Sequence, residues 1–140
     1  MVGAAREVTA EREIRENLQV SAMVLANSSE ALLLCDAGNR IVAVNPAFTH
    51  MTGYSFEEVA GKDPKLLASG QQNQDFYRSM WERIHATGKW QGEVWNRRKN
   101  GELFAEWLTI NTLYLDDGSV HRRVAPFSDI TETQRPEALV

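Results

Sequence analysis

One carboxylate could do chemistry because it falls among apolar neighbours. Glu106 lies within residues 104–110, where alternation along an extended strand places it on one face with three apolar side chains, Phe104, Leu108 and Ile110. A buried carboxylate is costly unless it finds a hydrogen-bond partner. We therefore expect Glu106 to bond either to a ligand or to Asn96, an amide on the preceding strand.

The remaining chemistry-bearing residues argue against several classes of function. Three scattered histidines and the single Cys35 form no metal cluster, disulfide or nucleophile–base pair, and no phosphate loop is present. A net charge of −4 gives no basis for nucleic-acid binding. No apolar run approaches the roughly 18 residues of a membrane span, and the charged residues 1–16 are unlike a secretory signal. We expect a non-catalytic, cytoplasmic domain without nucleic-acid or membrane contacts.

Capping residues predict two short helices in the first half of the chain. Asn45 can N-cap a helix that begins at Pro46, and Gly53 can end it in the left-handed conformation. Ser55 and Glu58 then have the spacing of a capping box at the start of a second helix.

Hydrophobic periodicity predicts the elements that must position these residues. The expected strands are residues 31–36, 40–45, 90–99, 102–115 and 120–130, and the expected helices are residues 9–26, 46–68 and 73–86. Asn100-Gly101 is a two-residue hairpin signal between two of the strands. Trp81 lies on the apolar face of the last helix, where it lines the core or a pocket. Segregated helices and hairpin-linked strands indicate an α+β domain with an antiparallel sheet.

The N-terminal helix carries an apolar stripe that could pair with a second subunit. Its spacing is four, four and three residues, made by Ile14, Leu18, Ala22 and Leu25. The stripe packs either on its own domain or on a second copy of the chain. Alternation places Trp95 and Trp107 on the sheet face opposite Asn96 and Glu106, and this helix could cover that face. A homodimer is the resulting hypothesis.

Three motifs, in this order, resemble those of the PAS sensor superfamily. They are residues 45–62 (NPAFTHMTGYSFEEVAGK), 90–102 (WQGEVWNRRKNGE) and 127–131 (FSDIT). The resemblance covers about residues 27–131 and implies a five-stranded antiparallel sheet with helices on one face and a pocket beneath them. It divides the chain into an N-terminal flanking helix (1–26), the PAS domain (27–131) and the start of a linker to an effector (132–140).

The resemblance implies a sensor and dimerisation domain of a bacterial signal-transduction protein. Such a domain relays a ligand or redox signal to a C-terminal effector. The 90–102 run is most similar to PAS domains found beside diguanylate cyclases and cyclic-di-GMP phosphodiesterases, although no cyclase signature occurs in these residues. Asp129 and Thr131, at the exit motif, are the expected relay residues.

Four interpretations of the pocket are open. Light-sensing LOV domains resemble this chain at residues 61–67, but Pro64 takes the place of their reactive cysteine. FAD-binding redox sensors resemble it at Trp90 and at Asn96, whose amide supplies the donor and acceptor that a flavin edge requires. His85 is near the place where some haem-binding members have an axial ligand, but a histidine is also favoured there by the helix dipole. The favoured expectation is no cofactor or an unknown small ligand, with FAD as the alternative and haem disfavoured.

Overall fold

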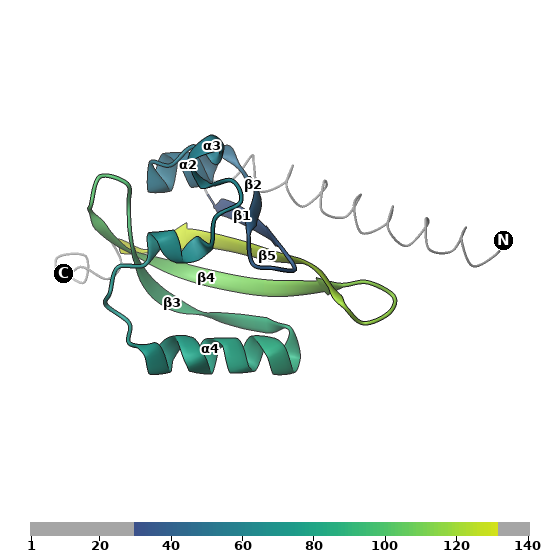
Figure 1. Ribbon diagram of the computed structural model, residues 1–140. Helices are drawn as coiled ribbons and strands as arrows, with labels where there is room; N and C mark the ends of the chain where they lie inside the picture. Colours follow the sequence, from purple (N-terminus) through teal and green to yellow (C-terminus); the bar gives the residue numbers. More distant parts are fainter. Residues whose placement is uncertain (1–29, 132–140) are drawn as a thin grey trace.

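The computed structural model describes residues 30–131, and these residues form a twisted antiparallel sheet with helices on one face (Figure 1). The strands are β1 (Ala31–Asp36), β2 (Ile41–Val44), β3 (Lys89–Arg97), β4 (Leu103–Tyr114) and β5 (Val120–Asp129). The helices are α2 (Pro46–Thr52), α3 (Phe56–Val59), the 3₁₀ helix η1 (Pro64–Leu67) and α4 (Gln74–Thr87). The expected α+β class and the five-stranded sheet are confirmed. The expected helix at 9–26 and the linker at 132–140 lie outside the described residues.

The strand order β2-β1-β5-β4-β3 places the last strand in the middle of the sheet. Hairpins join β1 to β2, β3 to β4 and β4 to β5, and every pairing is antiparallel. The sheet closes when β1 pairs with β5, so that Ala31 at the start of β1 lies opposite Phe127 near the end of β5. The first two strands therefore meet the last one, as the fold class requires.

The capping residues act as the sequence predicts. The Oδ1 atom of Asn45 accepts the backbone N–H of Phe48 at 3.0 Å and that of Leu32 at 2.8 Å, so one side chain both caps α2 and fastens it to β1. Ser55 and Glu58 form the reciprocal capping box of α3. These caps fix where the helices begin over the sheet.

The helical stretch predicted over residues 46–68 contains three short helices, one more than the two that the capping residues predict. Gly53 ends α2 with φ 83°, and Ala60 ends α3 with an extended ψ of 129°. Asp63 then caps η1 by accepting the N–H of Lys65 at 2.9 Å. Two turn-forming glycines, Gly53 and Gly61 (φ 75°), divide the stretch.

The β3–β4 hairpin has a wider turn than the two-residue turn predicted from Asn100-Gly101. The N–H of Arg98 bonds to the carbonyl of Glu102 at 2.8 Å, and Gly101 takes a positive φ of 91°. A turn of this kind needs only one residue in the left-handed region. Its position is fixed by α2, because the N–H of Lys99 donates to the carbonyl of Thr52 at 2.8 Å.

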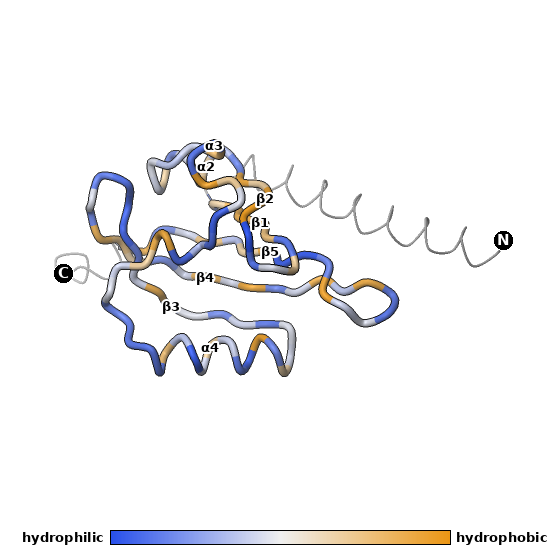
Figure 2. The backbone as a smooth tube through the Cα atoms, in the orientation of Figure 1, coloured by the Kyte–Doolittle hydropathy of each residue, from blue (hydrophilic) through white to orange (hydrophobic). Residues whose placement is uncertain are grey.

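The core lies between the sheet and the helices. The phenyl rings of Phe48 on α2 and Phe127 on β5 meet edge to face with centroids 6.0 Å apart. Figure 2 shows hydrophobic stretches in β1 and β2 and a hydrophilic β3–β4 turn. On the opposite face of the sheet Trp107 is 43% exposed, while Asn96 and Glu106 are buried. The predicted alternation of β3 and β4 is confirmed.

Candidate functional site

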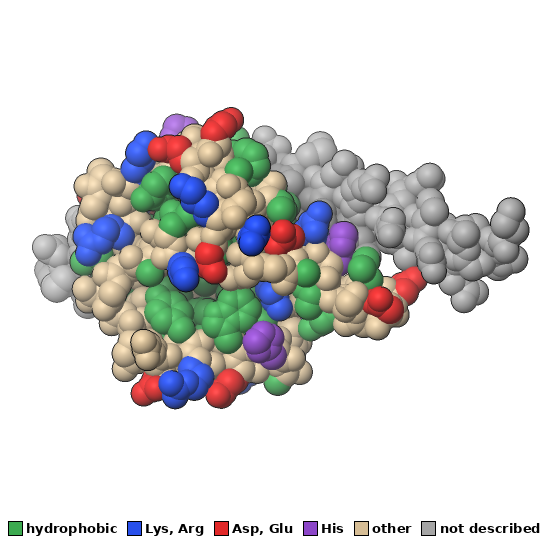
Figure 3. All heavy atoms as spheres, in the orientation of Figure 1, with side chains coloured by type: hydrophobic (Ala, Val, Ile, Leu, Met, Phe, Trp, Pro, Cys, Tyr) green, Lys and Arg blue, Asp and Glu red, His purple; other side chains and the backbone are tan. Residues whose placement is uncertain are grey.

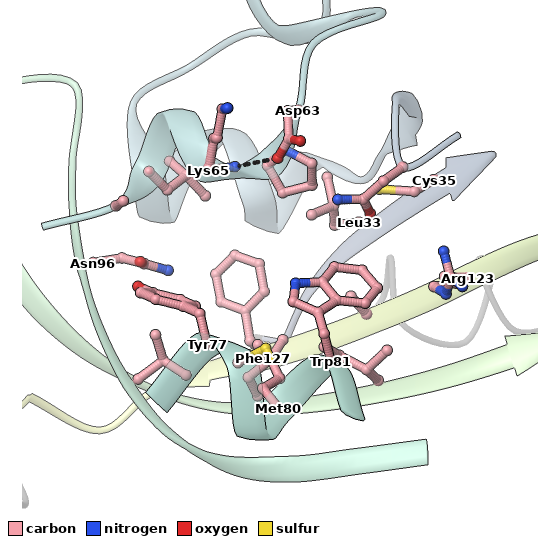
Figure 4. A pocket seen from close by; sticks show the side chains of 18 of the residues that line it. Leu33, Cys35, Asp63, Lys65, Tyr77, Met80, Trp81, Asn96, Arg123 and Phe127 are labelled. Carbon is pink, nitrogen blue, oxygen red and sulfur yellow. Dashed lines mark hydrogen bonds between the residues drawn. The ribbon is translucent and has the colours of Figure 1, made fainter. Parts of the chain in front are cut away.

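A cavity of about 680 Å³ lies between the sheet and the helices. Figure 3 shows hydrophobic side chains gathered in a recess on this side of the molecule, and Figure 4 shows the side chains that line it. Its floor comes from the strands and includes Leu33, Val94, Ile110 and Phe127. The volume falls within the range of about 300–1,000 Å³ that is usual for small-molecule sites.

Helix α4 forms one wall of the cavity. Asn73 caps its start by accepting the N–H of Phe76 at 2.9 Å, and Gly88 ends it with φ 78°. Tyr77, Met80 and Trp81 share the face turned toward the cavity, because residues three and four apart lie together on a helix. The spacing of α4 therefore supplies two aromatic rings to the site.

The η1 segment forms the roof. Pro64, Leu67 and Ala68 line the cavity from this side. Ala68 makes an isolated antiparallel bridge to Asn96 on β3, which attaches the roof to the sheet. Roof and floor thus meet at the residue that the sequence singles out as a ligand contact.

Asn96 and Glu106 form a hydrogen-bonded pair in the cavity lining. In the β3–β4 register, Glu106 lies opposite Val94, so Asn96 is its diagonal neighbour on the same face. Asn96 Nδ2 donates to Glu106 Oε1 at 2.5 Å. The other carboxyl oxygen, Oε2, is buried without a hydrogen-bond partner among the described residues. The predicted contact between the two residues is confirmed, and one polar atom is left for something else.

Burial decides the charge state of Glu106. Removal from water raises the pKa of this carboxyl to about 8, the nearby charge of Asp129 also raises it, and the bond from Asn96 only partly opposes the shift. At neutral pH the group is therefore mostly protonated. A neutral carboxylic acid can donate as well as accept a hydrogen bond, so the pair can bind a ligand that carries an acceptor atom.

The exit motif forms a second polar cluster next to the first. Asp129 Oδ1 accepts the backbone N–H of Thr131 at 2.9 Å and its hydroxyl at 2.5 Å, and Oδ2 accepts Arg98 Nη2 at 2.7 Å. Partial burial raises the pKa of Asp129, but the bonds from Thr131 and Arg98 outweigh it and hold the pKa below its usual value. Thr131 Oγ1 also accepts the N–H of Ala105 at 3.0 Å, which fastens the exit to β4.

The predicted site residues do not all lie in one place. Trp81, Asn96 and Glu106 line the cavity, whereas Trp90 does not. Trp90 packs edge to face on Phe76, with centroids 5.8 Å apart, and lies against Gly92. Trp90 lies at the start of β3 beside the first turn of α4, so its ring packs these two elements together. The predicted dimer contacts, Ile14, Leu18, Ala22 and Leu25, lie outside the described residues.

Sequence reasoning missed Arg123, which lines the end of the cavity away from Asn96 (Figure 4). Its side chain is buried, with the guanidinium carbon 5.1 Å from the centroid of the Trp81 ring. The signal was available, since alternation along β5 puts Arg123 on one face with Ala125 and Phe127. A cation at a core-facing position needs a partner for the same reason as the carboxyl group of Glu106.

His85 and Cys35 also line the cavity. His85 lies at the exposed end of α4, where its ring is 5.6 Å from that of Trp81. Burial raises the pKa of the Cys35 thiol to about 12. Within residues 30–131, no group of three or more His, Cys, Asp or Glu could hold a metal ion. No helix in this part of the chain is long and apolar enough to cross a membrane.

Comparison with known proteins agrees with this architecture. The model of the PAS domain family matches residues 29–132. A nitrogen fixation regulatory protein of Klebsiella oxytoca is 32% identical over 77% of this chain and 22% of its own length. A blue-light-activated histidine kinase of Rhizobium johnstonii is 30% identical over 71% of this chain and 29% of its own length. The structure of a fungal LOV domain photoreceptor superposes with a TM-score of 0.62 at 31% identity, covering 72% of this chain and 74% of that one.

The chain belongs to the PAS domain family, and a PAS domain is a sensor module of signalling proteins. The chain spans less than a third of the length of the two curated relatives. These are a regulatory protein and a histidine kinase, so they give no support to the predicted cyclic-di-GMP effector.

Proposed function

We propose that this PAS domain senses by binding a flat heterocyclic ligand of the flavin class in the cavity described above. The observation that carries the proposal is the unpartnered Oε2 atom of Glu106, which lies in the lining of a cavity of about 680 Å³. A buried polar atom without a partner is costly, and a ligand that bonds to it removes the cost. This reverses the order of preference drawn from the sequence alone, where a pocket without a cofactor came first.

The lining suits a flavin. Asn96 and the protonated Glu106 offer donors and acceptors at one end, as the edge of an isoalloxazine ring requires. Tyr77, Trp81 and Phe127 offer the apolar and aromatic surface on which a ring system packs. A bound flavin supplies redox chemistry, and the protein supplies binding, orientation and electrostatics.

Light sensing through a cysteine adduct is not part of the proposal. Pro64 stands in the roof where LOV domains have their cysteine. The one cysteine of the chain, Cys35, lies on β1, and with a pKa of about 12 its thiol stays protonated and weakly nucleophilic at neutral pH. The flavin similarity therefore favours a redox sensor over a photoreceptor.

The proposed relay runs from Glu106 to the exit motif. Glu106 on β4 pairs in register with Asp129 on β5, and Asp129 holds Thr131 and Arg98. A ligand that changes the charge or position of Glu106 would shift the population between two arrangements of this cluster. Four features stay predictions: the flanking helix 1–26, the linker 132–140, the homodimer and the attached effector. The link of that effector to cyclic-di-GMP also stays a prediction.

Flavin titration tests the ligand class. Purified protein is mixed with riboflavin, and binding is followed by the absorbance and the quenched fluorescence of the ring. We expect Glu106→Leu to weaken binding by at least about tenfold, because it removes a buried hydrogen bond to the ligand. Glu106→Gln, which keeps a donor, should bind nearly as well as the wild type.

Glu93→Leu is the matched control, because Glu93 is exposed on the neighbouring strand. It should leave the affinity unchanged. Absence of riboflavin, FMN and FAD binding to the wild-type chain would contradict the proposed ligand class. Equal affinity for the wild type and Glu106→Leu would contradict the assigned contact.

A further inference from the structure

The cavity has a second polar end that the flavin-ring contacts do not use. Arg123 on β5 lines the cavity at the end opposite Asn96 (Figure 4). Arg123 is only 8% exposed, and its Nε atom is fully buried without a hydrogen-bond partner among the described residues. A buried guanidinium that lacks a partner is unusual, because a charge removed from water needs compensation.

No neighbouring group among residues 30–131 forms an ion pair or a hydrogen bond with the guanidinium. Cys35, which pairs with Arg123 across β1 and β5, is a neutral thiol. The carboxylates of Asp36 and Asp63 accept backbone N–H groups of their own turns. Within residues 30–131, neither makes an ion pair with Arg123. The remaining contact is the face of the Trp81 ring at 5.1 Å, which leaves the N–H donors of the guanidinium free.

We propose that Arg123 binds an anionic group of the cavity ligand, a phosphate or a carboxylate, while the ring of that ligand contacts Asn96 and Glu106. A guanidinium presents a planar fork of donors that matches the oxygens of such anions. Lys65, which lines the cavity from the roof, adds a second positive charge. The inference rests on the proposed function, because it takes the ring ligand to be a flavin. It then selects the phosphorylated forms, FMN or FAD, over neutral riboflavin.

Paired titrations with riboflavin and FMN test the assignment, because the two differ only in the phosphate. The wild-type chain should bind FMN at least about tenfold more tightly than riboflavin, the usual effect of one charge-assisted hydrogen bond. Arg123→Gln should abolish this preference while leaving riboflavin affinity within about twofold. Arg123→Met, which keeps the hydrocarbon stem against Trp81, should do the same if the glutamine variant does not fold. Riboflavin binding itself reports an intact cavity.

Arg122→Gln is the matched control, since it removes the same charge from the adjacent position on the opposite face of β5. It should retain the FMN preference. Equal affinity of the wild type for FMN and riboflavin, or a preference that survives in both Arg123 variants, would overturn the role of Arg123 and leave the flavin proposal standing.

If the wild type binds no flavin at all, the flavin proposal fails and inorganic phosphate becomes the probe. Phosphate should then raise the melting temperature of the wild type and of Arg122→Gln, relative to chloride at equal ionic strength, but not that of Arg123→Gln. The same shift in all three proteins, or none in the wild type, would overturn the anion site as well.

Discussion

Glu106 in the floor of the cavity and Asp129 at the exit of the domain are both carboxyl groups, but the first is neutral and the second is negatively charged. Glu106 and Asp129 lie opposite each other in the register of β4 and β5. Burial raises the pKa of Glu106 to about 8, whereas hydrogen bonds from Thr131 and Arg98 outweigh partial burial and lower the pKa of Asp129. Adjacent positions in one sheet therefore hold a neutral acid and a carboxylate.

The difference teaches that burial and the number of hydrogen-bond donors together set the charge state, because Glu106 is fully buried with one donor and Asp129 is partly exposed with three. Asp129 receives three hydrogen bonds, one of them from a guanidinium, while Glu106 receives one from an amide. The charge of Asp129 is itself a cause of the raised pKa of Glu106. Because such coupling is reciprocal, a ligand that alters the protonation of Glu106 also alters the free energy of the charged Asp129 carboxylate at the exit.

The largest expected effect concerns Glu106. The wild type should lose stability as the pH rises, and Glu106→Gln should not. The folded protein binds a proton at Glu106 up to about pH 8, but the unfolded chain releases it near pH 4.5. The free energy of unfolding should therefore fall as pH rises through this window, by on the order of 3 kcal/mol between pH 5 and 8. Urea unfolding at a series of pH values measures it.

The Glu106→Gln variant should lack this slope, and the exposed control Glu93→Gln should keep it. A wild-type profile as flat as that of Glu106→Gln would show that burial does not hold the proton on Glu106.

Asp129→Ala should have an intermediate effect. It removes the ion pair with Arg98 and both bonds from Thr131, so we expect a loss of about 2 kcal/mol with the fold retained. It also removes a negative charge next to Glu106, so the pKa of Glu106 in the folded protein should fall. The pH range over which the free energy of unfolding decreases should then end at a lower pH than in the wild type. Urea unfolding at several pH values reports both effects, and complete unfolding of the variant would mean that Asp129 is only structural.

Thr131→Val should have the smallest effect. It removes the hydroxyl that accepts the Ala105 N–H and donates to Asp129, at a cost of about 1 kcal/mol. The pH profile assigned to Glu106 should not move, because both carboxyl groups remain. Thr109→Val, on the opposite face of β4 from Glu106, is the control and should be nearly neutral. A changed pH window in Thr131→Val would show that the two regions are coupled through the hydroxyl.

Local signals in the sequence predicted most of the fold. The caps at Asn45 and Ser55 and the alternation around Glu106 each depend on residues near one another in the chain, and all three are confirmed. The helix end at Gly53 was also predicted, but the separate helix η1 was missed because it depends on the turn at Gly61. The wider hairpin turn was missed because it is fixed from outside, by the bond from Lys99 to the carbonyl of Thr52.

The site was only partly predictable. Three cavity-lining residues could be identified because each interrupts or completes a periodic pattern: Trp81, Asn96 and Glu106. Trp90 was misplaced because its face of β3 is correct but its ring packs outside the cavity, against Phe76 in the first turn of α4. Alternation along β5 places Arg123 on the core-facing side, but its lack of a hydrogen-bond partner among residues 30–131 becomes visible only when β1, β5 and α4 are brought together.

The pairing of Ala31 with Phe127 has a mechanical consequence. Because β1 begins where β5 ends, the chain enters and leaves the folded domain at one point, so the domain can be inserted into a longer chain as a side branch. A tension applied between the two flanks would first load the bonds that hold Ile130 and Thr131 to Ala105, and would then separate β1 from β5 one hydrogen bond at a time. The first bonds under load lie beside Asp129, so the domain is weakest to pulling where its exit cluster sits.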